Sequence, residues 1–194
     1  EYFDPSERTG ASPLLVHPTL FYLMPGEVTT FSLKDSQEVV CAHPSIWSAI
    51  YRRDFLREFD IRFVEPAGAG WADNPFLFET LVSAASICWV PKAYYFYRQT
   101  NSSASSFLKD YRIPFDRLRE IRSFLEKRKP SIDIMAAFYK REFDYIYDVV
   151  STFGFSDEDA GVSACIREVI DSMDSAIVLS HPRLGEGEKI LYRS

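Results

Sequence analysis

Cysteine is scarce in this chain, and the few that occur stand far apart. Cys41, Cys88 and Cys165 make an odd number and show no CxxC spacing. A disulfide framework needs paired cysteines and a cysteine-bound zinc ion needs clustered ones, so the sequence argues against both. We expect reduced thiols, which is the usual state in a cytoplasmic protein.

Positive charge and long apolar runs are also lacking. The net charge is -6 at pH 7, whereas nucleic-acid binding needs a basic field that displaces counterions from phosphates. No apolar run approaches the roughly 18 to 20 residues that span a bilayer, and there is no signal peptide. The chain starts at Glu1, and its first residues show no strand-and-helix pattern. We therefore expect a piece of a longer protein that binds no nucleic acid.

Hydrophobic residues, by contrast, are plentiful. They make up 46% of the 194 residues, and 16 Phe and 11 Tyr are among them. This is enough apolar material for the core of one good-sized domain. Aromatic faces serve cores first and ring-shaped ligands such as sugars second.

Short extended pieces and short helices are expected in the first part of the chain. Four prolines interrupt residues 1–30, which predicts loops there. The hydrophobic pattern predicts a short helix within residues 32–43, a half-buried extended segment over 46–51, a helix over 54–59 and a strand over 61–64. A hairpin is expected over residues 87–98, with its turn at Pro91.

The stretch GAGWADNPFLFETL, residues 68–81, places an acid directly before an apolar helix pattern. Asn74 is a favoured N-cap residue, and Pro75 suits the first helical position because it needs no amide hydrogen there. Phe78 and Leu81 follow at helical spacing, so we expect a helix from about residue 75 to residue 86.

From Pro114 onward the periodicity is helical. We expect helices up to Pro130, from Ile132 to near Gly154, after Ser156, and over residues 186–192, with an internal boundary in the polar loop of residues 101–109. The first helix lies in a basic stretch, residues 111–129, that holds seven cations and three acids. Such a helix can rest on an anionic membrane surface or, more commonly, pack its apolar stripe on a core.

Several short motifs occur in an order that resembles the second half of family 2 glycosyltransferases of the GT-A fold, of the bacterial surface-polysaccharide type. In that family a Trp precedes YRR-x-FL and an extended IRF, and an acidic motif, a Phe-bearing helix, a Y-x-YR segment and a serine cluster follow. The corresponding pieces here are Trp47, residues 51–56, residues 61–63, Ala72-Asp73, Phe76, residues 95–98 and residues 102–106. The match covers residues 44–106, about a third of the chain.

The resemblance implies an α/β fold, a partial GT-A domain over residues 1–107, followed by a helical region over residues 108–194. It also implies transfer of a sugar from a nucleotide-sugar to a polysaccharide or lipid-linked acceptor, with inversion, in the cytoplasm and at the inner face of the membrane. A divalent cation, Mg²⁺ or Mn²⁺, is expected in the intact enzyme. Because the donor-binding half would lie upstream of Glu1, this piece alone is expected to be inactive.

The sequence also departs from the family pattern. Ser48-Ala49 stand where Asn-Lys is common, and Ala72 stands where Glu is usual. Residues 157–159 (DED) match Asp-x-Asp, but they lie far downstream at the expected start of a helix, where acids cap free amides. No metal ligand is therefore assigned in this chain.

By the resemblance, Asp73 is the general base that accepts the proton of the acceptor hydroxyl. In this role it is expected beside a helix N-terminus, whose dipole favours the ionised form and keeps its proton affinity modest. The alternative is that Asp73 only caps the helix together with Asn74. Trp71, Asn74, Tyr97 and Arg98 are the predicted binding residues. Trp71 either stacks on a sugar ring or fills the core, and Arg98 either holds the diphosphate or forms a structural ion pair.

Two further interpretations of the whole chain stay open. One is a non-catalytic helical interaction or regulatory module, in which Asp73 is buried and only caps its helix. The other is a degenerate, inactive transferase, which the substitutions at residues 48, 49 and 72 favour.

Overall fold

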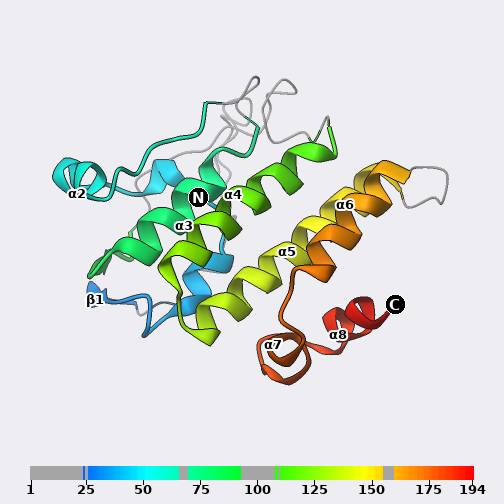
Figure 1. Cartoon of the computed structure of the whole chain (residues 1–194). Coiled ribbons are helices and arrows are strands. Elements are labelled where there is room, and N and C mark those ends of the chain that lie inside the picture. Colours follow the sequence, from blue (N-terminus) through cyan, green and yellow to red (C-terminus); the bar gives the residue numbers. More distant parts are fainter. Residues whose placement is uncertain (1–23, 25, 66–69, 93–107, 109, 155–159) are drawn as a thin grey trace, which may run out of the picture.

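The protein is mostly helical, with one small antiparallel sheet (Figure 1). The computed structural model describes residues 24, 26–65, 70–92, 108, 110–154 and 160–194. Within these ranges the sheet has two strands, and a Rossmann-like sheet of the GT-A kind is not found. The α/β expectation is therefore wrong for the described residues, whereas the helical C-terminal region is confirmed.

The first half of the described chain consists of short elements around one longer helix. They are β1 (Thr29–Phe31), η1 (Gln37–Cys41), η2 (Ile46–Ser48), α2 (Arg53–Glu58), α3 (Asp73–Ser83) and β2 (Ile87–Trp89). Strand β2 pairs with β1, with Thr29 opposite Trp89 and Phe31 opposite Ile87. The second strand expected for a hairpin over residues 87–98 falls largely on residues 93–98, outside the described ranges.

Two expected extended segments are wrong. Residues 46–48 form a 3-10 turn, and Ile50 is fully exposed and not half-buried in a strand. Residues 61–64 pair with no strand among the described residues; Ile61 is buried, whereas Phe63 stacks on Phe76 with ring centroids 4.0 Å apart. A local apolar pattern cannot specify a strand unless a neighbouring strand satisfies its backbone groups.

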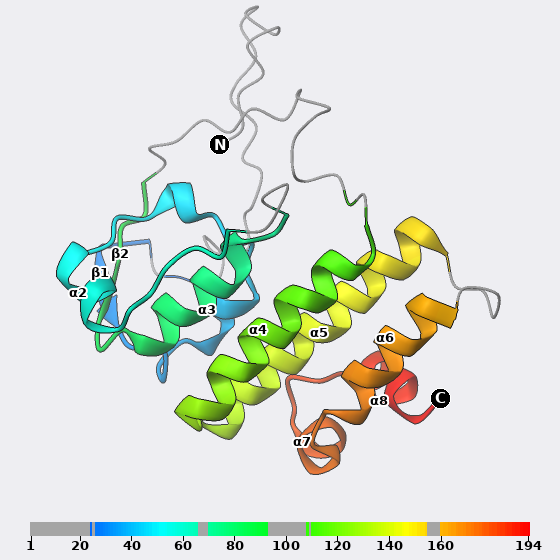
Figure 2. The ribbon, with the colours of Figure 1, turned by 45° about the horizontal axis from the view of Figure 1, so that its top comes forward.

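The second half is built from five helices: α4 (Arg112–Arg128), α5 (Ile132–Phe153), α6 (Ala160–Asp171), α7 (Ser175–Ser180) and α8 (Glu186–Arg193). Helices α4, α5 and α6 lie side by side with alternating direction, and the two-stranded sheet lies on the side away from α6 (Figure 2). The hydroxyl of Ser131 caps α5 by accepting from the amide of Ile134 at 3.4 Å.

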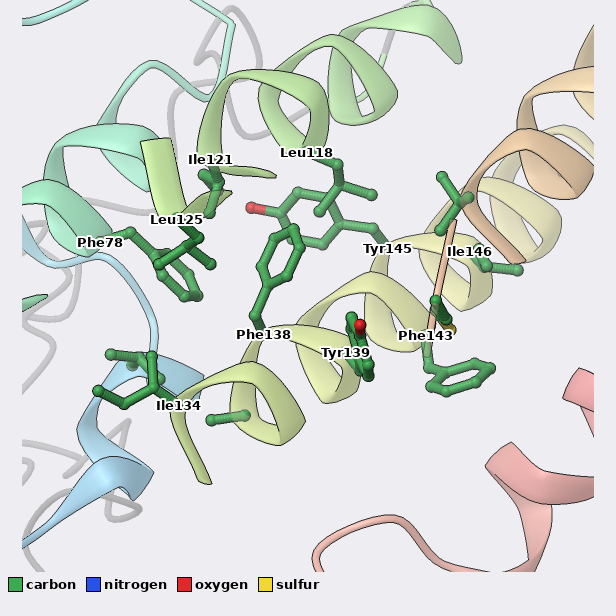
Figure 3. Packing of buried hydrophobic residues seen from close by; sticks show 14 of the residues in the cluster. Phe78, Leu118, Ile121, Leu125, Ile134, Phe138, Tyr139, Phe143, Tyr145 and Ile146 are labelled. Carbon is green, nitrogen blue, oxygen red and sulfur yellow. The ribbon is translucent and has the colours of Figure 1, made fainter. Parts of the chain in front are cut away.

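Helix α5 is the centre of the hydrophobic core. Figure 3 shows its side chains meeting Phe78 of α3 and the apolar stripe of α4. The rings of Phe78 and Phe138 make an edge contact, with centroids 5.7 Å apart, and both are fully buried. The same core includes residues from before and after the polar loop of residues 101–109. The division into domains 1–107 and 108–194 stays a prediction.

The basic stretch of residues 111–129 packs its apolar side on this core. The four residues of the predicted stripe, Phe115, Leu118, Ile121 and Leu125, are all fully buried. Several of its cations pair with acids, as in the contact of Arg119 with Glu168 of α6 at 2.6 Å. Because the apolar face of α4 is covered by the core, only the charged residues of this helix are available to contact a membrane.

The end of α5 gives a prediction about two glycines. Gly154 terminates α5 with φ of 78°, a backbone conformation that costs a residue with a Cβ about 1 kcal/mol or more. Gly187 lies inside α8, where a Cβ would meet nothing within 4 Å. We expect Gly154→Ala to lower the free energy of unfolding by about 1 kcal/mol, and Gly187→Ala to raise it by about 0.5 to 1 kcal/mol. Urea denaturation measures the change in the free energy of unfolding for each variant. Changes of the same sign in the two variants would contradict the assigned backbone conformations.

A buried ion pair connects α4 with α5. Glu142 is fully buried, and its Oε1 accepts from Nη2 of Arg122 at 2.5 Å. Nη1 of the same arginine donates to the carbonyl of Ser172 at 2.9 Å, at the end of α6. Oε2 of Glu142 has no partner among the described residues. Burial raises the pKa of Glu142 to about 8, and the charge of Arg122 offsets only part of this effect.

From the pair of Glu142 and Arg122 we predict that the stability of the folded protein falls as the pH rises. The pKa of Glu142 in the folded protein, about 8, is above its ordinary value of 4.5. The folded state therefore holds this proton more tightly than the unfolded state, and stability is lost between pH 4.5 and pH 8. We expect Glu142→Gln to remove most of this loss in denaturation experiments across that range. Glu126→Gln, at an exposed position of α4, is the control and should leave the pH dependence unchanged.

Candidate functional site

The candidate site lies where α3 begins. Ala72 occupies the N-cap position without a side-chain hydrogen bond, and Asp73 and Asn74 are the first two helical residues. The prediction that Asn74 caps a helix starting at Pro75 is therefore wrong. The amide of Asn74 already donates to the carbonyl of Trp71 at 3.1 Å, which closes the first turn earlier than expected.

Trp71 holds an unusual backbone conformation directly before this helix. Its φ is 57°, in the left-handed region that bulky residues rarely occupy. The indole is partly buried and meets the ring of Tyr145 edge-on, with centroids 4.7 Å apart. This contact supports the core interpretation of Trp71, and its stacking on a sugar stays a prediction. Strained residues of this kind cluster at functional sites because surrounding contacts must hold them.

Asp73 is half-buried at the start of α3. Its Oδ1 accepts from Nδ2 of Asn74 at 3.2 Å, and among the described residues it forms no ion pair. Burial raises the pKa of Asp73, while main-chain amides, Asn74 and the charge of Arg141 offset this in part. The expected modest proton affinity is thus corrected, since loss of solvent outweighs the helix dipole. A carboxyl with this environment is a better base than an exposed one.

Asn74 supports Asp73 and is itself hidden from solvent. It is 4% exposed, and its Nδ2 also lies 3.5 Å from the carbonyl of Trp71. Its Oδ1 has no partner among the described residues. A buried amide oxygen without a hydrogen-bond partner lowers the stability of the folded protein. Packing alone therefore does not account for an asparagine at this position. The direct role predicted for Asn74 in binding is untested, but its contact with Asp73 is clear.

Two residues of α5 belong to the site and were not found from the sequence. Tyr145 is buried, and in Figure 3 its ring extends from α5 toward α4, with the hydroxyl at the end nearer Ile121. That hydroxyl has no partner among the described residues. Arg141 is also buried, and its guanidinium lies 5.9 Å from the ring of Tyr145. The sequence did contain one sign of this part of the site, namely a charged residue, Arg141, inside the apolar pattern of α5.

The structure also brings three of the family-like motifs together around Phe76 of α3. Tyr51 of the YRRDFL piece meets Phe76 edge-on at 5.1 Å, and Phe63 of the IRF piece stacks on it at 4.0 Å. These three aromatic rings fix the approach of residues 50–64 to the helix that begins with Asp73. The other predicted residues, Tyr97 and Arg98, lie outside the described ranges, as do residues 102–106 and 157–159.

Side chains that commonly bind metal ions are not clustered among the described residues. In the part of the chain that the structure describes, no three His, Cys, Asp or Glu side chains are grouped closely enough to hold one. The Mg²⁺ or Mn²⁺ implied by the resemblance was expected to bind mainly to a part of the protein upstream of Glu1, and it stays a prediction. A search of the same ranges for a helix with the length and apolar character of a membrane span also found none.

Comparisons of the chain with known protein families, curated proteins and solved structures gave no match. The function must therefore be argued from the geometry around Asp73.

Proposed function

We propose that this chain is the acceptor-side part of an inverting glycosyltransferase and that Asp73 is its general base. The observation that carries the proposal is the half-buried carboxyl at the start of α3, whose pKa is raised by burial. No cation among the described residues neutralises it in an ion pair, so it remains available to accept a proton. The strained backbone of Trp71 two residues earlier supports a functional rather than a purely structural turn.

In the proposed reaction an acceptor hydroxyl attacks the anomeric carbon of a nucleotide-sugar. The hydroxyl proton passes to the carboxylate of Asp73 as the new C–O bond forms, and the nucleoside diphosphate leaves from the opposite face. Asn74 donates to Oδ1 of Asp73 and so helps to hold the carboxyl in place. The donor site, including Tyr97, Arg98 and any divalent cation, is assigned to parts of the protein beyond the described residues.

The acceptor in this proposal is a glycan or a lipid-linked sugar, and the reaction takes place in the cytoplasm at the inner face of the membrane. The support is the order of motifs around Phe76, three of which pack together in the structure. The same motifs support the proposed partial GT-A domain over residues 1–107.

One observation favours a second candidate, a non-catalytic helical interaction module. The described residues are mostly helical and share one core around α5. This candidate gives Asp73 a capping role; Ala72 occupies the N-cap position, and the Asp73 carboxyl accepts hydrogen bonds from main-chain amides at the start of α3.

The test is an assay of the full-length protein. A panel of UDP-, GDP- and TDP-sugars is offered with glycan and lipid-linked acceptors, and product is analysed by mass and by anomeric configuration. We expect transfer from at least one donor with an inverted linkage that depends on Asp73. Transfer with retention of configuration would contradict the inverting mechanism with Asp73 as its base, whereas a protein that transfers from no donor would favour the non-catalytic module.

A further inference from the structure

Arg141 connects the candidate site to a distant part of the chain. Its Nη2 donates to the carbonyl of Val40 at 2.8 Å and also to that of Ala42, at the end of η1. These carbonyls are separated from Arg141 by 101 and 99 residues. Hydrogen bonds from a charged donor to carbonyls are among the stronger ones in proteins, so η1 fixes the guanidinium in place.

A continuous series of contacts leads from Arg141 to Asp73. The guanidinium lies 5.9 Å from the ring of Tyr145, and that ring contacts Trp71, with centroids 4.7 Å apart. Trp71 is two residues before Asp73 and holds the left-handed conformation that starts α3. Packing at Tyr145 therefore restrains both the strained turn and the position of the carboxyl that follows it.

The positive charge of Arg141 has no acidic side chain in ion-pair contact with it among the described residues. It is 7% exposed, and among the described residues it forms no ion pair. A buried guanidinium without a neighbouring carboxylate is costly unless more distant acids compensate it. The acids that respond to its charge include Asp73 and Asp148, and its charge lowers the pKa of both against the effect of burial.

We propose that Arg141 is a positioning residue for Asp73: it holds the Trp71 turn through its contact with Tyr145, and its positively charged guanidinium is one of several groups that act on the Asp73 carboxyl. This inference rests on the proposed function for its catalytic meaning. Arg141 is buried, and its Nη2 donates to main-chain carbonyls. It therefore acts on the reaction through Asp73 and does not touch a substrate.

The other groups near Arg141 do not take over its role. Tyr145 and Cys41 are neutral near pH 7, because burial raises the pKa of each. Asp148 and Asp144 on α5 are acids, and Asp144 is paired with Lys140 at 2.8 Å. Among the described residues, Arg141 is the cation whose charge acts on the pKa of Asp73.

The electrostatic part can be tested on this chain without any activity. Carboxyl carbon NMR follows the titration of Asp73, assigned by comparison with Asp73→Asn. We expect Arg141→Gln to move the titration midpoint of Asp73 upward and Arg141→Lys to restore most of the original midpoint. Arg122→Gln is the matched control, because Arg122 also lies on the core but faces Glu142. It should leave Asp73 unchanged.

An unchanged Asp73 midpoint in a folded Arg141→Gln protein overturns the proposal, and so does an equal shift in the Arg122→Gln control. If Arg141→Gln does not fold, the Nε resonance of Arg141 is compared in the parent chain and in Asp73→Asn. That nitrogen is buried without a partner among the described residues, so it should respond to the lost charge at position 73. A resonance that does not move contradicts the coupling.

The intact enzyme then separates this inference from the proposed function. In Arg141→Gln the acidic limb of the transfer rate should move to higher pH, because a base that holds its proton more tightly is inactive over a wider range. If Asp73→Asn retains transfer while the NMR shift is present, the proposed base is wrong and the electrostatic coupling stands. A shifted NMR midpoint with an unmoved acidic limb rejects the role of Arg141 in the reaction.

Discussion

Replacing Phe138 by alanine is expected to lower the free energy of unfolding by about 3 to 5 kcal/mol. Phe138 is fully buried in the middle of α5 and meets Phe78 of α3 across 60 residues of sequence. Removing the ring deletes that contact and leaves a cavity that the rigid helices α3, α4 and α5 cannot close. Urea or guanidinium denaturation of the chain measures the change.

Tyr147→Ala is the matched control for this prediction. Tyr147 lies on the same helix and is also aromatic, but it is 72% exposed. Its loss should change the free energy of unfolding by no more than about 0.5 kcal/mol. Similar losses in both variants would mean that α5 is not the centre of the core. Two separate unfolding transitions in the parent chain would show that residues before and after the polar loop fold independently, which supports the proposed domain division.

Replacing Asp73 by asparagine is expected to reduce sugar transfer by the intact enzyme about 10²- to 10⁴-fold, the usual contribution of a general base. Asparagine has nearly the same shape, so the start of α3 should be preserved. Its stability should change little, since the half-buried carboxyl is replaced by a neutral amide that needs no charge compensation. Initial rates with saturating donor and acceptor, together with thermal denaturation, measure the two effects separately.

Asp54→Asn provides the control, because Asp54 also lies in the first turn of a helix, α2, but is exposed. We expect this variant to transfer sugar at the parent rate. Transfer that survives Asp73→Asn within a few-fold removes the assignment of the base. An equal loss in both variants would point to a general effect of charge and not to the chemistry of position 73.

Helices whose burial follows their own periodicity could be predicted from the sequence. The stripe of α4, from Phe115 to Leu125, is buried as its spacing indicates. Periodicity is a poorer guide to the burial of α5, where the apolar Ile132 is 62% exposed, whereas Arg141 and Glu142 are buried. Helix α5 is covered on several sides by elements from distant parts of the chain, and a one-sided pattern does not describe such a helix.

The candidate site was only half accessible to sequence reasoning. Trp71, Asp73 and Asn74 lie within four residues of one another in a recognisable motif, so a linear pattern could find them. Tyr145 and Arg141 reach the same place through contacts between segments that are more than seventy residues apart, which no local pattern records. Helix α7 was missed for a similar reason, because its short turn depends on the Asp174 side chain accepting from the amide of Ala176 at 2.8 Å.

The most direct test of Asp73 as the base is a comparison of two titrations. One is the pH dependence of single-turnover sugar transfer by the intact enzyme, and the other is the NMR titration of the Asp73 carboxyl in the same protein. We predict that the acidic limb of the rate coincides with the Asp73 midpoint, that this midpoint lies above the ordinary aspartate value, and that Arg141→Gln moves both upward together. An acidic limb that lies elsewhere, or that persists unchanged in Asp73→Asn, would contradict the account.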